Sequence, residues 1–423
     1  MSSSDAHKVL IRESSLTSKG EAELPKAKLA VELALVATLA SMLIISSVFS
    51  TLMSDFIVRS SGTIITMSPL HVEGKDIKDA LGRTVYLRGI NKVEFADDPD
   101  GIWMDETIWD EANVKAELDA MKSWGVNLIR CHQAVEHWKY DMNQPYAGIS
   151  HKAAIKRLLQ LAAERGIYVV YDAYRVTNYW NGGDQDPLPY PPYQLSQGAS
   201  SVIANQQQFV EWWASVANEL KDYTNVIFEL WNEPCGDDTA MRSWFNISQR
   251  CITAIRATGA TQLIIFQWEM ACWVNLDYPP PSNEASTMDW VWQANLTDPT
   301  GNLVYSTHLY RTYGHFHHSQ PTFWNAWNYS DIQLAFQYFK FPQVVSNYPL
   351  IIGEIGADLS KTGTELQHEL TALDNCFKLF EEMQIHYVPF WWREIGIFAL
   401  HNGVPNFAPN EAGQIVKSHL LSP

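Results

Sequence analysis

The chain has 423 residues, of which 46% are hydrophobic, so it can bury a large core and is not intrinsically disordered over most of its length. Its formal charge is −17, because 47 acidic residues outnumber 30 basic ones. A negative surface is repelled by a phosphate backbone, so nucleic acid is disfavoured as a partner.

The first distinct segment is an uncharged apolar stretch at 33–53. At about 1.5 Å per residue, it just spans roughly 30 Å of hydrocarbon. Basic residues are concentrated before it, which keeps the N-terminus in the cytoplasm. We expect a cytoplasmic tail at 1–32, an uncleaved transmembrane signal anchor at 33–53, a tether at 54–69 and an extracellular domain at 70–423. A cleaved signal peptide, which would yield a secreted protein, and a buried core helix are the alternatives.

Eight apolar, strand-like runs follow the tether, separated by stretches with helical spacing. We expect the strands at 84–91, 127–132, 168–174, 226–233, 262–268, 302–310, 349–356 and 387–392. Helices with apolar residues every three to four positions are expected between them, as at 113–125, 153–166 and 366–383. This alternation predicts an α/β fold, a closed (β/α)8 TIM barrel.

An open, doubly wound sheet is the alternative fold. Such a sheet usually carries a glycine-rich phosphate loop after its first strand, whereas this chain continues with NKVEFADD. Residues 70–83, which end in a turn-like stretch at 80–83, are predicted to form a hairpin that closes the bottom of the barrel. Long insertions are expected at about 175–201, 269–301 and 311–330.

Polar residues at the carboxyl ends of barrel strands are candidates for chemistry, because active sites are built at that face. Glu233 ends the strand expected at 226–233, and Glu354 lies near the end of the strand expected at 349–356. These carboxylates come from nearly opposite sides of the ring. Cleavage of a glycosidic bond requires one protonated and one ionised carboxyl group. We therefore expect Glu233 and Glu354 to be catalytic, with two structural strand-end carboxylates as the alternative.

The chain resembles glycoside hydrolase family 5 over about residues 70–400. The motifs that carry the resemblance are LRGIN (87–91), Arg130 in NLIRCH, LWNEP (230–234), His308-Leu309-Tyr310, IIGEIG (351–356) and a tryptophan-rich last strand. The resemblance implies that Glu233 is the acid/base and Glu354 the nucleophile of a retaining double displacement. It implies an endo-acting β-1,4-glucanase of the cellulase type. A β-1,4-mannanase, or a catalytically inactive carbohydrate-binding membrane protein, is the alternative.

Further substrate-binding residues are expected around this pair. Arg130 would stabilise ionised Glu354, and Asn232 would donate to the sugar 2-hydroxyl. The resemblance places His308 near the acid/base and Tyr310 near the nucleophile. Structural roles, such as a salt bridge of Arg130, are the alternatives.

The last strand and the strand expected at 168–174 supply further candidate substrate-binding residues. Trp391 is expected to form the sugar-stacking floor, and Trp392 to face the barrel wall. The family often has Asp-x-His after the third strand, where this chain has Asp172-Ala173-Tyr174. Tyr174 is therefore a candidate contact to a sugar hydroxyl, and His132 a candidate replacement for the missing imidazole.

We expect neither a metal nor a cofactor. His315, His317 and His318 form a short cluster, but they have no cysteine or carboxylate at ligand spacing. The expected partners of a monomeric protein are a polysaccharide and, through 33–53, the membrane. Loop tryptophans are expected to offer further stacking subsites or to pack beneath the loops: Trp180, Trp268, Trp273, Trp290, Trp292, Trp324 and Trp327.

Overall fold

The computed structural model describes residues 67–93, 95, 109–141, 148–175, 206–234, 238–270, 287–311 and 326–422. The predicted cytoplasmic tail, the anchor at 33–53, nearly all of the tether and most of the three long insertions lie outside these ranges. Within them, none of the helices combines the length and the apolar character needed to cross a membrane.

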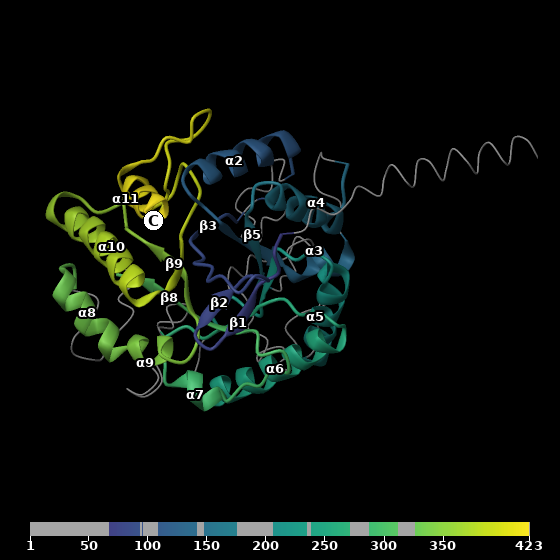
Figure 1. Ribbon diagram of the computed structural model, residues 1–423. Helices are drawn as coiled ribbons and strands as arrows, with labels where there is room; N and C mark the ends of the chain where they lie inside the picture. The colour runs from purple at the N-terminus through teal and green to yellow at the C-terminus, as the bar shows by residue number, and fades with distance from the viewer. Residues whose placement is uncertain are drawn as a thin grey trace, which may run out of the picture. The chain divides into compact units, whose positions relative to one another are not determined.

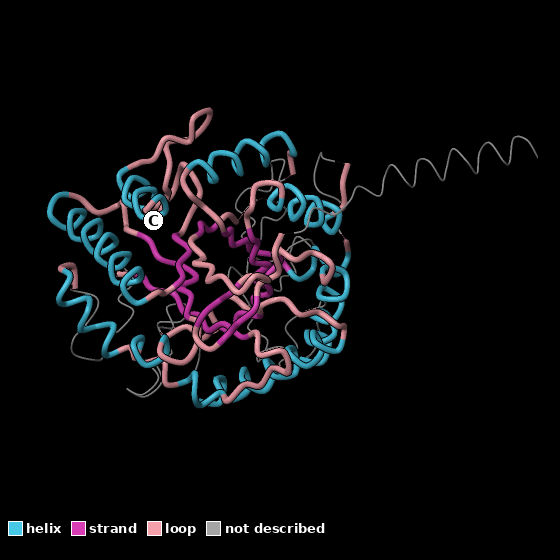
Figure 2. The backbone as a smooth tube through the Cα atoms, in the orientation of Figure 1, coloured by secondary structure: helices cyan, strands magenta, loops and turns pink. Residues whose placement is uncertain are grey.

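Eight parallel strands of the described chain form one sheet and follow one another around it in chain order. They are β3 (Gly89–Asn91), β4 (Leu128–Ala134), β5 (Tyr168–Arg175), β6 (Val226–Glu229), β7 (Ile264–Gln267), β8 (Leu303–Tyr310), β9 (Leu350–Gly356) and β10 (His386–Pro389). The ring closes where Arg88, beside β3, bridges in parallel to Tyr387 on β10. The predicted (β/α)8 barrel is confirmed, with the strands gathered at its centre (Figure 2).

Helices surround the strands on the outside (Figure 1). They are α2 (Glu111–Ser123), α3 (Val135–Tyr140), α4 (His151–Ala163), α5 (Gln206–Leu220), α6 (Asp238–Ala257), α7 (Trp290–Ala294), α8 (Tyr329–Tyr338), α9 (Phe341–Val345), α10 (Gly363–Met383) and α11 (Glu411–Leu421). Side-chain oxygens of Asp110 and Ser150 accept backbone N–H groups at the starts of α2 and α4, which satisfies donors that a helix leaves unpaired. The helices expected at 113–125, 153–166 and 366–383 correspond to α2, α4 and α10.

An apolar layer fills the lower part of the barrel. Residues two apart on a strand share a face, so alternate residues point inside. The buried cluster includes Leu128, Tyr168, Val170, Ile227, Ile265, Val304, Ile351 and Val388. An antiparallel hairpin, β1 (His71–Glu73) with β2 (Asp76–Lys78), adds Ile77 to this cluster and covers the amino-terminal end of the barrel. The predicted hairpin is present. Its two strands join at Gly74 and Lys75, and residues 79–83 form the turn that ends it.

Several strands are shorter than the apolar runs predicted, and three of them end or begin several residues inside the run. The run at 84–91 is a strand only from Gly89, the run at 226–233 ends as a strand at Glu229, and the run at 387–392 ends at Pro389. The reason is clearest at Glu233, whose φ of 47° lies in the left-handed region that no strand adopts. The chain therefore turns at the Asn-Glu-Pro motif, and Glu233 is held in a turn.

Candidate active site

A buried arginine organises the polar layer directly above the apolar one. Arg130 is two residues beyond inward-facing Leu128 on β4, and it is 1% exposed. Its guanidinium lies 2.5 Å from Glu229 Oε2, 3.0 Å from Asp172 Oδ2 and 2.8 Å from Glu354 Oε1. These carboxylates come from three different strands. One cation thus holds together side chains from β4, β5, β6 and β9.

The charges around Arg130 do not balance, because three carboxyl groups face one guanidinium. Burial, followed by the nearby charges of Glu229 and Glu354, raises the pKa of Asp172 well above its usual value, although Arg130 opposes this shift. Asp172 therefore binds a proton more tightly in this site than it would in water. Burial opposes the charge of Arg130 itself, but the surrounding carboxylates outweigh burial and raise its pKa.

Glu354 is surrounded by positive charge and hydrogen-bond donors. Arg130 Nη1 donates to its Oε1 at 2.8 Å, and the hydroxyl of Tyr310 donates to its Oε2 at 2.7 Å. Burial alone would raise the pKa of Glu354. The charge of His308, the hydrogen bond from His132 and the charge of Arg130 outweigh burial and hold that pKa well below its usual range. Glu354 is therefore ionised at neutral pH.

Glu233 is held by a different set of contacts. Its Oε1 lies 2.8 Å from His308 Nδ1, and its backbone N–H donates to Gln267 Oε1 at 3.1 Å. The imidazole of His308 fits here because residue 353 is glycine: a Cβ at that position would stand 2.9 Å from His308 Nε2. His308 and Tyr310, two residues apart on β8, thus hydrogen-bond to different carboxylates, Glu233 and Glu354 respectively, although His308 Nδ1 also lies 3.6 Å from Glu354 Oε2.

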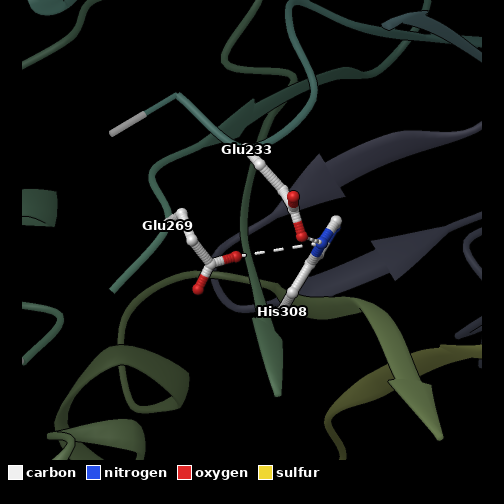
Figure 3. A group of neighbouring side chains, drawn as sticks. All are labelled: Glu233, Glu269 and His308. Atoms are coloured by element: carbon white, nitrogen blue, oxygen red, sulfur yellow. Dashed lines mark hydrogen bonds and ion pairs between the residues drawn. The ribbon is translucent and has the colours of Figure 1, made fainter. Parts of the chain in front are cut away.

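A third carboxylate, Glu269, lies beside His308 (Figure 3). Its Oε2 is 3.8 Å from His308 Nδ1, and ligand atoms of Glu233, Glu269 and His308 all lie within 4.8 Å of one another. One imidazole nitrogen with two carboxylate oxygens is a donor set that a divalent transition ion can take. The hydrogen bond between Glu233 and His308 accounts for the approach of these two groups without an ion.

Two asparagines connect the network to the mouth of the barrel. Asn232 Oδ1 accepts from Arg130 Nη2 at 2.8 Å, which leaves its NH2 group on the side away from the guanidinium. Asn91 Oδ1 also accepts from Arg130, and its amide donates to the carbonyl groups of Gly353 and Val388. Asn91 therefore ties β3 to both β9 and β10.

His132 and Tyr174 lie side by side next to Glu354. His132 Nε2 is 2.6 Å from Arg130 Nη1 and 3.3 Å from Glu354 Oε1. The rings of His132 and Tyr174 stack with their centroids 4.3 Å apart. The structure thus brings His132 to the nucleophile candidate, with Tyr174 partly exposed beyond it.

The two tryptophans after β10 differ in exposure. Trp391 is partly exposed, stacks on Phe390 with centroids 4.7 Å apart, and has the Arg393 guanidinium 4.7 Å from its ring. Trp392 is fully buried and packs edge-on against Trp124. Of the two rings, Trp391 is the one that is partly exposed.

The other candidates have mixed outcomes. Trp268 and Trp290 are buried and pack against Phe245 and Phe266 respectively, whereas Trp292 and Trp327 are exposed. The remaining residues lie outside the described ranges: Trp180, Trp273, Trp324, His315, His317 and His318.

Sequence reasoning missed five polar residues of the site: Asn91, Asp172, Glu229, Gln267 and Glu269. Each except Asn91 follows, at a spacing of two or four, an inward-facing apolar residue such as Val170, Ile227 or Ile265. A carboxyl or amide group at an inward position of an apolar strand was the signal that could have found them.

The site combines an ionised carboxylate with a second carboxylate bonded to an imidazole, at the carboxyl ends of barrel strands. Such a pair can protonate a departing oxygen while supplying electron density to the carbon that it leaves. This geometry defines a glycoside hydrolase type of site.

Comparison with known proteins identifies the family. The family model of the cellulases (glycosyl hydrolase family 5) matches residues 79–394, well over half of the sequence. The chain therefore belongs to the cellulase family, glycosyl hydrolase family 5.

Individual relatives match more locally. Endo-β-1,4-glucanase B of Emericella nidulans is 32% identical over 115 residues, 26% of this chain and 30% of that protein. A mannan endo-1,4-β-mannosidase of Cellvibrio japonicus is 22% identical over 294 residues, 68% of this chain and 52% of that protein. The matched regions thus span about a third to a half of these relatives.

Solved structures share the fold over most of the chain. A β-glucanase of Saccharophagus degradans, in complex with cellotetraose, has a TM-score of 0.61 at 17% identity and covers 84% of this chain and 94% of its own. At this level of identity, the likeness shows a common fold.

Proposed function

We propose that the protein is a retaining, endo-acting glycoside hydrolase that cleaves β-1,4-glucan of the cellulose type. Glu354 attacks the anomeric carbon while Glu233 transfers its proton to the departing glycosidic oxygen, so one C–O bond forms as the other breaks. Water then attacks the same carbon, its proton passes to Glu233, and the bond to Glu354 is released.

The separation of the two carboxylates is the observation that carries this proposal. Glu233 Oε1 and Glu354 Oε2 lie 2.8 Å and 3.6 Å from the same nitrogen, His308 Nδ1. Together these distances keep the two oxygens less than roughly 6.5 Å apart, which is the lower limit for an inverting pair, whereas retaining pairs lie roughly 5–5.5 Å apart. The spacing leaves too little room for a water molecule between the carboxylate and the sugar, and therefore favours retention.

The surrounding residues support the assignment of roles. Glu354, ionised by its neighbours, is suited to attack. Asn232 is oriented by Arg130 so that its NH2 group is available to the sugar 2-hydroxyl. Trp391 offers the partly exposed ring on which a sugar stacks.

Glucan is the substrate favoured by the family's name and by the glucanase relatives. Mannan is the second candidate, because a mannosidase matches 68% of this chain. The two sugars differ in the orientation of one hydroxyl group. Tyr174 is a candidate contact to a sugar hydroxyl, because it stands where the family often has the histidine of Asp-x-His. His132 is a candidate replacement for that imidazole.

Reducing-end release from carboxymethylcellulose, β-glucan, mannan and xylan tests the substrate. We expect the fastest release from the first two, with a rapid fall in viscosity because internal bonds are cut. Proton NMR of the first product tests the stereochemistry, and a β-anomer is expected. Faster cleavage of mannan would reassign the substrate, and an α-anomer would refute the double displacement.

We also propose that the barrel is a monomer held outside the cell by a membrane anchor at 33–53. The uncharged length of this segment and the basic residues before it support an anchor. Carbonate extraction of membranes from cells expressing the full chain tests the proposal. We expect the protein to stay with the membrane, and recovery of the full-length chain in the wash would refute the anchor.

A further inference from the structure

Arg311 and Glu369 form a buried pair outside the barrel, and the two-glutamate mechanism gives neither of them a role. Arg311 directly follows Tyr310, the last residue of β8. Its guanidinium reaches outward to α10, where Nη1 donates to Glu369 Oε1. The two side chains are 10% and 1% exposed. A buried pair of this kind is costly to break, because either partner alone would be left in an apolar surrounding.

Glu369 joins the ends of the two strands that carry the proposed nucleophile and its hydroxyl donor. Its Oε1 accepts from Arg311, one residue past β8, and its Oε2 accepts the backbone N–H of Asp358 at 3.2 Å, two residues past β9. On these strands, the Tyr310 hydroxyl donates to Glu354 Oε2 at 2.7 Å. One carboxyl group on α10 therefore holds both strand ends beside that hydrogen bond.

Arg311 also holds the segment that leads into α8. Its Nε donates to the carbonyl of Ala326 at 3.2 Å, so one guanidinium binds both α10 and the chain just before α8. Local opening of a structure costs least at the ends of its elements. Because Tyr310 is the last residue of β8, Arg311 is placed to keep it in the sheet.

The ring of Tyr310 is packed against Phe398, with centroids 4.8 Å apart. This packing needs a glycine at position 356, which pairs with Tyr310 in the sheet, because a Cβ there would stand 2.8 Å from Phe398 Cδ1. Since packing limits how far the ring can turn, the position of the hydroxyl follows that of the backbone at the end of β8.

We propose that Arg311 and Glu369 are positioning residues that hold the Tyr310 hydroxyl against Glu354. They act through the ends of β8 and β9. When the pair is broken, the end of β8 loosens, and the hydroxyl no longer stays within hydrogen-bond distance of the carboxylate that it stabilises. The inference rests on the proposed function, because it requires Glu354 to be the nucleophile.

A double-mutant cycle with Tyr310→Phe tests this role, because a residue that acts through the hydroxyl loses its effect once the hydroxyl is gone. We expect Arg311→Met alone to lower kcat about tenfold on the β-glycan that the wild type cleaves fastest. In the Tyr310→Phe background, the same change should lower kcat by less than about twofold. If the two losses simply multiply, the proposal is wrong.

Glu369→Gln breaks the same pair from the side of α10. Its single amide oxygen cannot replace both carboxylate oxygens, so either Arg311 or the N–H of Asp358 loses its acceptor. We expect kcat to fall by about three- to tenfold, again with little further loss in the Tyr310→Phe background. A direct electrostatic effect on Glu354 would have opposite signs when a cation and a carboxylate are removed. Losses in both variants therefore support positioning, and a gain in Glu369→Gln would overturn it.

Arg256 and Asp298 provide a matched control. They form a pair of similar burial, 5% and 0% exposed, that joins the end of α6 to the segment before β8. Arg256→Met should lower the midpoint of urea unfolding as Arg311→Met does, but leave kcat within about twofold of the wild type. A tenfold loss of kcat in this control would show that any buried pair of the fold has the same effect, and would overturn the proposal.

Arg311→Lys keeps the test decisive if Arg311→Met does not fold. The ammonium group retains the charge, but it cannot reproduce the fork that binds Glu369 and Ala326 together. We expect a loss of about threefold in kcat that disappears in the Tyr310→Phe background. An unchanged kcat, or the same loss with and without the hydroxyl, would overturn the proposal.

The outcomes separate this inference from the proposed function. A wild-type enzyme that cleaves no β-glycan refutes the proposed function and this inference with it. A wild-type enzyme that cleaves β-glucan or mannan, together with losses from Arg311→Met and Tyr310→Phe that multiply, refutes only the positioning role.

Discussion

The two sides of the site, named here the nucleophile wall and the acid wall after the roles proposed for Glu354 and Glu233, present the same side chain in different electrostatic surroundings. On the β4 and β9 side, Glu354 receives hydrogen bonds from Arg130 and Tyr310. On the β6 and β7 side, Glu233 shares His308 with a further carboxylate, Glu269. Because the side chains are identical, only their neighbours distinguish a nucleophile from an acid.

The two glutamates also differ in how the backbone holds them. Glu354 lies inside β9, between paired strands, so its direction follows from the strand itself. Glu233 lies in a turn with a left-handed φ, beyond the last residue of β6. Its direction depends on contacts from the end of β7. The side chain of the proposed nucleophile, Glu354, is therefore fixed by strand pairing, and that of the proposed acid, Glu233, by hydrogen bonds to a turn.

The largest loss of activity is expected when either glutamate is replaced by alanine, and the two replacements should differ in their substrate dependence. Glu354→Ala should lower kcat on any β-glycan by at least about 10⁴-fold, because no bond to the anomeric carbon can form. Glu233→Ala should lose about 10²–10⁴-fold on polysaccharide, but much less on a substrate with a good leaving group.

Azide distinguishes the two losses. It should restore turnover of Glu354→Ala by attacking the anomeric carbon of the bound substrate directly, which yields an α-glycosyl azide. In Glu233→Ala it should attack the glycosyl-enzyme and yield a β-glycosyl azide. NMR of the products checks both outcomes. The same azide anomer from both variants would contradict the assignment of roles.

The strands could be predicted from the sequence, but only some of the contacts between charged side chains could. Apolar runs such as 168–174 and 302–310 identify strands because both faces of a barrel strand are buried. The predicted end of β6 was wrong. The sequence at 226–233 stays mostly apolar, although the chain turns at Glu233, whose φ is left-handed. The contact of Glu269 with His308 joins strands that are far apart in sequence, so no local pattern contains it.

The next effect concerns the cation of the nucleophile wall. Arg130→Met leaves the carboxylates of Glu229 and Glu354 buried without their main counter-charge. We expect this to lower the free energy of unfolding by about 3–5 kcal/mol, as measured by urea denaturation at pH 7. Arg83→Met is the control, because its ion pair with Asp79 leaves Arg83 mostly exposed and should be worth no more than about 1 kcal/mol. Equal losses would contradict a special role for Arg130.

Tyr310→Phe makes a smaller change to the nucleophile wall, the loss of one hydroxyl group. It removes the hydroxyl that donates to Glu354 Oε2 at 2.7 Å, a hydrogen bond to a charged group worth about 1.5–3 kcal/mol. Since that bond favours the ionised carboxylate, its loss should move the acidic limb of the kcat/KM profile to higher pH and lower kcat about tenfold or more. Tyr305→Phe, at an outward position of β8, serves as the control. An acidic limb that stays in place in Tyr310→Phe would contradict this role of the hydroxyl.

The smallest effect is expected at Asp172, the carboxyl group of this site whose pKa is raised. The pKa of Asp172 is raised in the folded protein by burial and by Glu229, so the folded state binds a proton that the unfolded state releases above its usual pKa near 4. Stability from this group is therefore greatest at low pH and falls as the pH rises towards the folded pKa. Asp172→Asn replaces the carboxyl group with an amide of nearly the same shape, and we expect it to change the free energy of unfolding at pH 5 by less than about 1 kcal/mol. It should also reduce the loss of stability between pH 5 and 8. A loss at pH 5 as large as that of Arg130→Met would mean that Asp172 is ionised, and that Arg130 balances three charges.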